Sequence, residues 1–277
     1  MGRLKTPLRY PGGKSKATKK MAPFFPPTDN VKHYREPFIG GGSVALWMCE
    51  NYNLETVWVN DLYWSLYNFW IQLRDDGDNL SDMLREMKMN HPDPDSARKL
   101  FVECNHRIDD ESLPLLDRAA AFWTVNKCAF SGLIDIHSFS AGPSNKNFTL
   151  QGIQDLKEYS KMIKHWKITN LSYEELLKDD DDETFIYLDP PYEISSNLYG
   201  KKGAMHKGFD HDLFAEHCNQ PTLSYRAISY NSDRSVKDRF PEWNQHDFPL
   251  TYTMRSNSAN YRNNQPKRLE LLLTNYD

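Results

Sequence analysis

The sequence predicts an α/β fold in which a mainly parallel sheet carries an inserted, mainly helical subdomain. Two apolar runs with strand character end directly in acidic residues, Asp61 and Asp189, and a run of three glycines follows the first expected strand. The run at 185–188 has the β-branched and aromatic residues of a buried strand, and the two prolines at 190–191 cannot continue a central strand. A chain of 277 residues can bury one substantial core and a small subdomain.

The first part of the chain is expected to begin with an arm and a helix start at 1–25, which carries a Tyr-Pro-Gly-Gly-Lys turn. Core strands are expected near 33–37 and at 56–60. A helix is expected to open at residue 44, directly behind the glycine loop. After the second strand, apolar residues recur at helical spacing, which predicts an amphipathic helix packed on the core.

The middle of the chain, residues 77–164, is predicted to be the inserted subdomain. Acidic residues and a glycine at 75–78, and prolines and aspartates at 91–95, punctuate the sequence. A helical region is expected through residue 123, followed by a loop of Ser, Gly, Asn and Pro between residues 131 and 152. The core is then made of residues 1–76 and 165–277.

The last part of the chain is expected to complete the sheet. A strand at 166–171 resumes the core, and the strand that ends at Asp189 follows it. The remaining expected elements are a helix near 210–220, a strand at about 225–230, a helix after residue 233, and a terminal hairpin at 245–254 and 269–276.

The Asp-Pro-Pro-Tyr segment at 189–192 suits a site that holds an exocyclic amine on a flat ring. It is expected at the carboxyl end of a strand, which is where ligands bind in α/β sheets. The carboxylate and a proline carbonyl can accept both N–H bonds of the amine, and the tyrosine can stack on the ring. The alternative is a plain structural turn, because Asp-Pro turns are common.

The glycines at 40–42 predict a β-α-β unit that binds a nucleoside. Glycine lets the backbone approach a ligand closely, and the N-terminus of the helix behind the loop favours a polar or anionic group. Asp61 lies 21 residues after Gly40, the spacing at which such a unit offers a carboxylate to ribose hydroxyls. With Ala45 in the third place, the loop also fits the looser dinucleotide fingerprint, but nicotinamide chemistry has no use for Asp-Pro-Pro-Tyr. A flexible glycine loop and a solvated helix cap are the alternatives.

Four motifs in this order resemble those of the Dam-type DNA adenine-N6 methyltransferases, in the α group of amino-methyltransferases. They are Leu-Arg-Tyr-Pro-Gly-Gly-Lys at 8–14, Glu-Pro-Phe-Ile-Gly-Gly-Gly at 36–42, Asn-Asp at 60–61 and Asp-Pro-Pro-Tyr at 189–192. The resemblance runs from about residue 7 to the C-terminus. It implies a Rossmann-like sheet of the S-adenosylmethionine-dependent methyltransferases, with a target-recognition insert. It also implies transfer of a methyl group from S-adenosylmethionine to N6 of a flipped adenine at a specific site in double-stranded DNA.

The resemblance assigns roles to individual residues. The expected catalytic residues are Asp189, Pro190, Pro191 and Tyr192. The expected cofactor-binding residues are Tyr10, Lys14, Phe38, Gly40, Gly42, Asp61 and Asp189. Hydrogen bonds from the target amine to the Asp189 carboxylate and the Pro190 carbonyl would stabilise positive charge as it develops on nitrogen, and binding supplies proximity to the methyl group. Flipping the base out of the duplex costs roughly a few kcal/mol.

The charge distribution favours DNA binding although the net charge is −4. Residues 1–20 and 255–268 contain no acidic residue, and residues 197–211 contain one. These clusters predict a basic cleft on an otherwise acidic surface, with solvated basic faces as the alternative. The expected DNA-binding residues are Lys14, His137, Asn145, Lys146, Asn147, Lys201, Lys202 and Arg262.

The expected recognition segment departs from the family pattern. Relatives that methylate GATC carry Asn-Gly-Leu-x-Arg, whose arginine is placed for a bidentate guanine contact. The matching stretch at 131–135 reads Ser-Gly-Leu-Ile-Asp, so that Asp135 stands at the arginine position. GATC is therefore not the expected target.

Other activities stay open from the sequence. Methylation of cytosine N4 uses a similar tetrapeptide, and an RNA methyltransferase can share the same site. A DNA-binding module whose catalysis has decayed is a third alternative, although the intact motifs argue against it. A nicotinamide-dependent oxidoreductase is the least favoured.

Composition indicates the cellular setting. The four cysteines have neither metal-ligand spacing nor the density of a disulfide framework, which favours a reducing cytosol. No signal peptide and no membrane span are expected, because no stretch approaches 18 apolar residues. We expect a cytoplasmic, nucleoid-associated protein of a prokaryotic or phage-infected cell, with no metal and a monomeric or weakly dimeric state. Restriction-modification is the expected role, and phage self-protection and gene regulation are the alternatives.

Overall fold

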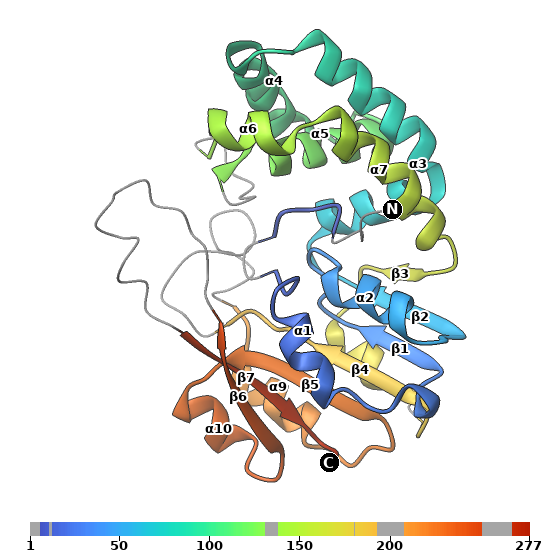
Figure 1. Ribbon diagram of the computed structural model, residues 1–277, viewed down its shortest axis with the longest axis vertical. Helices are drawn as coiled ribbons and strands as arrows, with labels where there is room; N and C mark the ends of the chain where they lie inside the picture. Colours follow the sequence, from blue (N-terminus) through green and yellow to red (C-terminus); the bar gives the residue numbers. More distant parts are fainter. Residues whose placement is uncertain (1–5, 11–12, 131–137, 180, 193–207, 251–267) are drawn as a thin grey trace.

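A seven-stranded sheet forms the centre of the protein (Figure 1). The computed structural model describes residues 6–10, 13–130, 138–179, 181–192, 208–250 and 268–277. The strands are β1 His33–Glu36, β2 Thr56–Asn60, β3 Lys167–Thr169, β4 Thr184–Leu188, β5 Tyr225–Asn231, β6 Asn244–Leu250 and β7 Arg268–Thr274. Their order in the sheet is β3-β2-β1-β4-β5-β7-β6, with β1 to β5 parallel and β7 antiparallel to β5 and β6. The mainly parallel, Rossmann-like sheet predicted from the sequence is confirmed.

The chain changes direction across the sheet between β1 and β4. On one side of this point lie β2 and β3, and on the other lies β5. The two central strands, β1 and β4, are parallel, with Arg35 opposite Ile186. The segments that follow them therefore leave the sheet at the same end, the carboxyl end of the strands. A crevice at such a switch point is where open α/β sheets bind ligands.

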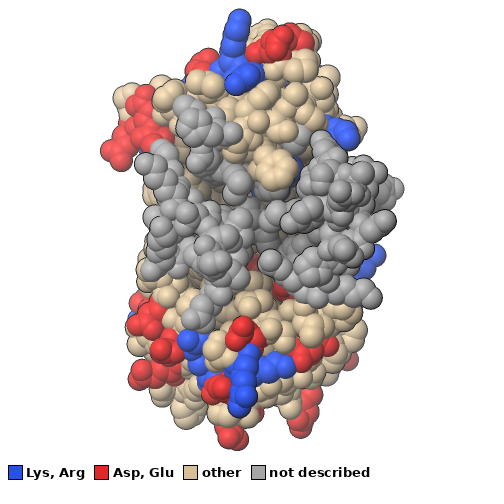
Figure 2. All heavy atoms as spheres, turned by 90° about the vertical axis from the view of Figure 1, so that its left-hand side faces the viewer, with Lys and Arg blue, Asp and Glu red and all other residues tan. Residues whose placement is uncertain are grey.

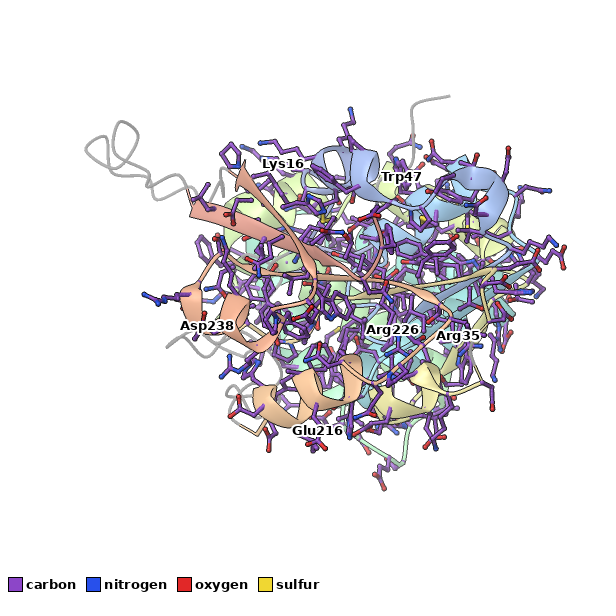
Figure 3. The ribbon with its side chains drawn as sticks, turned by 90° about the horizontal axis from the view of Figure 1, so that it is seen from below. Lys16, Arg35, Trp47, Glu216, Arg226 and Asp238 are labelled. Atoms are coloured by element: carbon purple, nitrogen blue, oxygen red, sulfur yellow. The ribbon has the colours of Figure 1, made fainter. Side chains whose placement is uncertain are left out.

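The middle strand β4 is buried on both faces. Its side chains alternate between two apolar clusters, with Phe185 and Tyr187 in one and Ile186 and Leu188 in the other. Figure 3 shows the helices that cover these faces: Trp47, on α2 (Ser43–Asn51), and Lys16 lie on one side of the sheet and Glu216, on α9 (His211–Cys218), on the other. Two shorter helices complete the core, α1 Thr18–Met21 and α10 Arg234–Arg239.

A layer of helices lies beyond the β3 edge of the sheet, at the top of Figure 1. These helices are α3 Trp64–Asn90, α4 Pro94–Arg107, α5 Leu115–Cys128, α6 Ala141–Asn147 and α7 Leu150–Met162. The long helix α3 packs against α5 and α7. Buried side chains of α3, α5 and α7 belong to the same apolar cluster as those of β1 and β2, so the layer and that face of the sheet share a core.

Helix α3 passes through residues 75–78, where the sequence favoured a break. Only Asp76 departs from helical geometry, with φ −138° and ψ 38°. Gly77 lies so close to α7 that an added Cβ would come within 2.4 Å of the Ser160 Cβ. The chain therefore kinks at Asp76, between two helical segments of α3, where the sequence favoured a break, and the second segment begins with Gly77 packed on α7. The predicted division between residues 76 and 77 falls inside this helix and stays a prediction.

The sequence predicted a loop between residues 131 and 152, and this prediction is wrong for the second half of the segment. Residues 141–147 form α6, and α7 begins at residue 150. Ser144 and Phe148 are fully buried, and the Phe148 ring packs against Trp123 at 5.9 Å between centroids. The Thr149 hydroxyl accepts a hydrogen bond from the Gly152 N–H and caps α7. Packing and capping thus override the weak helix propensity of Ser, Gly and Asn.

The described residues hold neither a membrane-spanning helix nor a metal site of the usual kind. None of their helices is both long and apolar enough to cross a bilayer. No three His, Cys, Asp or Glu side chains among them come together as metal ligands.

Replacement of Gly77 by Ala tests the contact between α3 and α7. We expect Gly77→Ala to lower the free energy of unfolding by about 1–3 kcal/mol, because the new methyl group must displace Ser160. The matched control is Gly142→Ala in α6, where no heavy atom lies within 4 Å of an added Cβ. This control should be neutral or stabilising by up to about 1 kcal/mol, because Ala favours helix. Urea unfolding measures both, and equal effects would contradict the close packing.

Candidate active site at the carboxyl ends of the parallel strands

A cavity of about 280 Å³ opens where β1, β2 and β4 end. The segments that follow these strands line it, together with the N-terminal arm. Six predicted cofactor-binding residues are in its lining: Tyr10, Lys14, Phe38, Gly40, Asp61 and Asp189. The seventh, Gly42, lies behind the wall, at the start of α2. The fold therefore brings together residues that lie up to 179 positions apart in the sequence.

The glycine turn between β1 and α2 has a backbone that favours glycine. Gly40 has φ +48° and Gly42 has φ +70°, in the left-handed region. An added Cβ at Gly40 would lie 3.0 Å from the Tyr10 ring, and one at Gly42 would lie 2.7 Å from the Trp70 ring. Trp70 also donates a hydrogen bond from Nε1 to the Gly40 carbonyl at 3.1 Å. Aromatic rings on two sides thus fix the shape of the turn.

Asp61 follows β2 and braces the glycine turn. Its Oδ2 accepts a hydrogen bond from the Gly40 N–H at 3.0 Å, and its Oδ1 accepts one from the Tyr63 N–H at 3.0 Å. Burial raises the pKa of Asp61 to about 6, and these two backbone hydrogen bonds oppose the shift. Each oxygen has a second lone pair, so the carboxylate can accept further hydrogen bonds from a ligand in the cavity.

Asp189 follows β4 and is held by a residue from the next strand. Ser229, on β5, donates a hydrogen bond from its hydroxyl to Asp189 Oδ1 at 2.8 Å. The Tyr187 hydroxyl lies 2.8 Å from the same serine oxygen, so a buried chain of three polar groups ends at the carboxylate. Sequence reasoning missed Ser229, because only the pairing of β4 with β5 places it there.

Lys14 forms an ion pair with Asp189 inside the site. Its Nζ lies 2.7 Å from Oδ1 and 2.8 Å from Oδ2 of the carboxylate, and the lysine side chain is 3% exposed. The same ammonium lies 4.7 Å from the centroid of the Tyr192 ring, within the range of a cation–π interaction. Lys14 therefore contacts both ends of the Asp-Pro-Pro-Tyr segment. Pro191 lines the cavity beside them.

Glu36 is a second acidic residue of the site, to which sequence reasoning gave no role. It ends β1, is 2% exposed, lines the cavity and accepts a hydrogen bond from the Tyr34 hydroxyl at 2.7 Å. Burial raises its pKa well above the usual value, and the nearby Asp189 charge raises it further, while Lys14 lowers it. The signal was its position directly before the glycine loop, at the end of a predicted strand.

Apolar side chains form another wall of the cavity. Leu62 and Leu171, which follow β2 and β3, both line it and are exposed by 59% and 42%. Phe38 lies beside them and stacks on Tyr173 with ring centroids 5.6 Å apart. Exposed leucines beside a stacked aromatic pair offer a surface for a flat ring, and the sequence motifs did not single out these leucines.

Four of the predicted DNA-binding residues are described by the structure, and one of them, Lys14, lies in the cavity. Asn145, Lys146 and Asn147 lie on α6 in the helical layer, where Asn145 and Lys146 are exposed. His137, Lys201, Lys202 and Arg262 lie outside the described residues, as does Asp135. On the face in Figure 2, acidic and basic side chains of the described residues lie close together. The basic cleft stays a prediction.

The sheet order and the site define the chain as an α/β methyltransferase. Residues 10–254 match the family model of the D12 class N6 adenine-specific DNA methyltransferases, and the chain belongs to this family. It is thus an enzyme that methylates N6 of adenine at specific sites in DNA.

Two relatives cover most of the chain. The Type II methyltransferase M.MjaIII of Methanocaldococcus jannaschii is 27% identical over 201 residues, which are 67% of this chain and 68% of the relative. The Type II methyltransferase M1.LlaDCHI of Lactococcus lactis subsp. cremoris is 23% identical over 283 residues, 97% of this chain and 94% of the relative.

Proposed function

We propose that S-adenosylmethionine is the methyl donor and that it binds in the cavity at the ends of β1, β2 and β4. The observation that carries the proposal is the shared cavity of Asp61 and Asp189, which joins a nucleoside site to an amine site. Asp61 can accept hydrogen bonds from ribose hydroxyls, and Leu62 and Leu171 can pack on the purine. An added Cβ at Gly40 would meet the Tyr10 ring, so the glycine lets Tyr10 pack against this wall of the cavity.

The charged groups near Asp189 suit the amino-acid end of this donor. Lys14 can bind its carboxylate, and Glu36 and Asp189 can accept hydrogen bonds from its ammonium group. When bound, S-adenosylmethionine supplies a methyl group activated on a sulfonium. Tyr10 and Phe38 frame the binding site, and Gly42 supports it from behind.

The catalytic role belongs to the segment 189–192. The Asp189 carboxylate has about four lone pairs, and Ser229 and Lys14 leave acceptor capacity for an adenine N6–H. The Pro190 carbonyl can accept the second N–H, with Pro191 stiffening the turn. These acceptors stabilise positive charge as N6 is methylated, and the preorganised network needs little rearrangement. Tyr192 is proposed to stack on the flipped base.

The DNA partner is proposed to be an unmodified duplex, bound between the sheet edge and the helical layer. Residues 77–164 would then act as the target-recognition subdomain, with Asn145, Lys146 and Asn147 as contacts. The remaining proposed contacts are Lys14, His137, Lys201, Lys202 and Arg262. The names of the Type II relatives support a restriction-modification role. We place the enzyme on DNA in the cytoplasm, as a monomer or weak dimer.

The first experiment is methyl transfer from labelled S-adenosylmethionine to unmodified duplex DNA, followed by nucleoside analysis. Label in N6-methyladenine supports the proposal, and sequencing of the product then gives the recognition site. Label in N4-methylcytosine, or in RNA but not DNA, would replace the proposed substrate. Absence of cofactor binding would overturn the assignment of the cavity.

Replacement of Asp189 tests the catalytic assignment. We expect Asp189→Asn to lower the rate of methyl transfer by about 100-fold or more, because loss of a preorganised charged acceptor costs about this much. The control is Asp212→Asn, at an exposed carboxylate that pairs with Arg239 on the protein surface. Near-normal turnover by the Asp189 variant, with a normal unfolding curve, would refute this role.

The raised pKa of Asp61 predicts a pH dependence of cofactor binding. Ribose hydroxyls donate to the ionised carboxylate, so cofactor affinity should fall as pH drops through about 6, by about tenfold per unit well below that pH. The effect of pH on the stability of the cofactor-free protein has the opposite sign. Because the pKa of Asp61 is raised in the folded state, its contribution to the free energy of unfolding is fully present below about pH 4 and is lost as pH rises from about 4 to 6. Calorimetric titration between pH 5 and 7.5 measures the affinity.

Asp61→Asn is the matched variant for this titration. It should bind the cofactor weakly, with a flatter pH profile, while its affinity for DNA changes little. An unchanged pH profile in the variant would assign the titration to another group. Weaker DNA binding with normal cofactor binding would mean that Asp61 has a different role.

A further inference from the structure

Glu270 is a buried acidic residue outside the cavity, and no step described above uses it. It lies on β7 between β5 and β6, opposite Asn231 on one side and Phe248 on the other. Its side chain is 1% exposed. Burial of a carboxyl group is costly unless partners satisfy it, so its contacts indicate what it does.

One of its partners is the tyrosine of the catalytic segment. The Tyr192 hydroxyl donates a hydrogen bond to Glu270 Oε2 at 2.7 Å, and the tyrosine is 6% exposed. Tyr192 follows β4 and Glu270 lies on β7, and β5 lies between these two strands in the sheet (Figure 1). The tyrosine side chain thus reaches over β5, where the Tyr230 ring lies 5.8 Å away at 31°.

The hydroxyl end of the Tyr192 ring is therefore fixed, and the Lys14 ammonium lies over one ring face, although Tyr192 itself is not part of the cavity lining. Lys14 Nζ lies 4.7 Å from the ring centroid and pairs with Asp189, so this face lies beside the catalytic carboxylate. A stacking platform works only if its plane is held at a defined angle. Ring torsion about χ2 is broad for tyrosine, and a hydroxyl anchor together with a neighbouring ring restricts it.

We propose that Glu270 is a positioning residue for methyl transfer, which acts by anchoring the Tyr192 hydroxyl so that the ring face is preset for the target base. The proposal rests on the proposed stacking role of Tyr192. Glu270 touches neither the cavity nor the expected position of the donor. Loss of the anchor should therefore slow the chemical step and leave cofactor binding unchanged.

Three variants test the anchor by single-turnover methyl transfer and by cofactor titration. Glu270→Leu removes the acceptor and should slow methyl transfer by about tenfold, the effect of one lost buried hydrogen bond, with less than a twofold change in cofactor affinity. Tyr192→Phe removes the donor and should slow it to a similar extent. Glu270→Gln keeps an acceptor oxygen and should recover most of the rate.

The double variant Tyr192→Phe/Glu270→Leu gives the sharpest result. Because both changes break the same hydrogen bond, the double variant should be no slower than the slower single variant. Additive losses would overturn the proposal. If Glu270→Leu fails to fold, Tyr192→Phe alone carries the test, and a normal rate of methyl transfer in that variant would overturn the proposal.

Thr274→Val is the matched control on the same strand. Thr274 is 1% exposed and donates a hydrogen bond to the Tyr276 carbonyl, away from Tyr192. The Thr274→Val variant should lower the free energy of unfolding without slowing methyl transfer. An equal slowing would mean that damage to β7 alone causes the effect, which also overturns the proposal. A wild-type protein that makes no N6-methyladenine would instead refute the proposed function.

Discussion

The parallel pairing of β1 with β4 is the constraint on which the site depends. It brings two segments about 150 residues apart to one edge of the sheet, in a register that places Arg35 opposite Ile186. Glu36 and the glycine turn follow one strand, and Asp189 follows the other. Because β4 is buried on both faces, this register is tightly specified. The residues that follow both strands therefore line one cavity.

Polar groups at the site are held by partners from neighbouring elements. Asp189 is held by Ser229 of β5 and by Lys14 of the N-terminal arm, and Glu36 is held by Tyr34 of its own strand. Buried polar groups are costly when unpaired and strong when paired, so such a network favours one arrangement. Because these polar groups are already in place, the site needs little reorganisation during the reaction.

The sequence predicted the parts of the fold whose signals are local. Strands β1, β2 and β4 are short runs that end at motif residues, and three successive glycines indicate the turn after β1. Helix α6 and the close contact of α3 with α7 depend instead on contacts with distant residues such as Trp123 and Ser160. Ser229 meets Asp189, and Glu270 meets Tyr192, only through strand pairing, which periodicity cannot reveal. Phe38, Gly40, Asp61 and Asp189 meet in one cavity because they follow predicted strands, whereas Tyr10 and Lys14 reach it from the N-terminal arm.

Trp70 connects the helical layer directly to the glycine turn. It belongs to α3, donates a hydrogen bond to the Gly40 carbonyl, and has its ring against Gly42. Any displacement of α3 by bound DNA would be transmitted to the turn that faces the donor. Thermodynamic linkage then requires reciprocity: whatever factor DNA imposes on donor affinity, the donor imposes on DNA affinity. One indole ring would then carry the coupling between the two substrates in both directions.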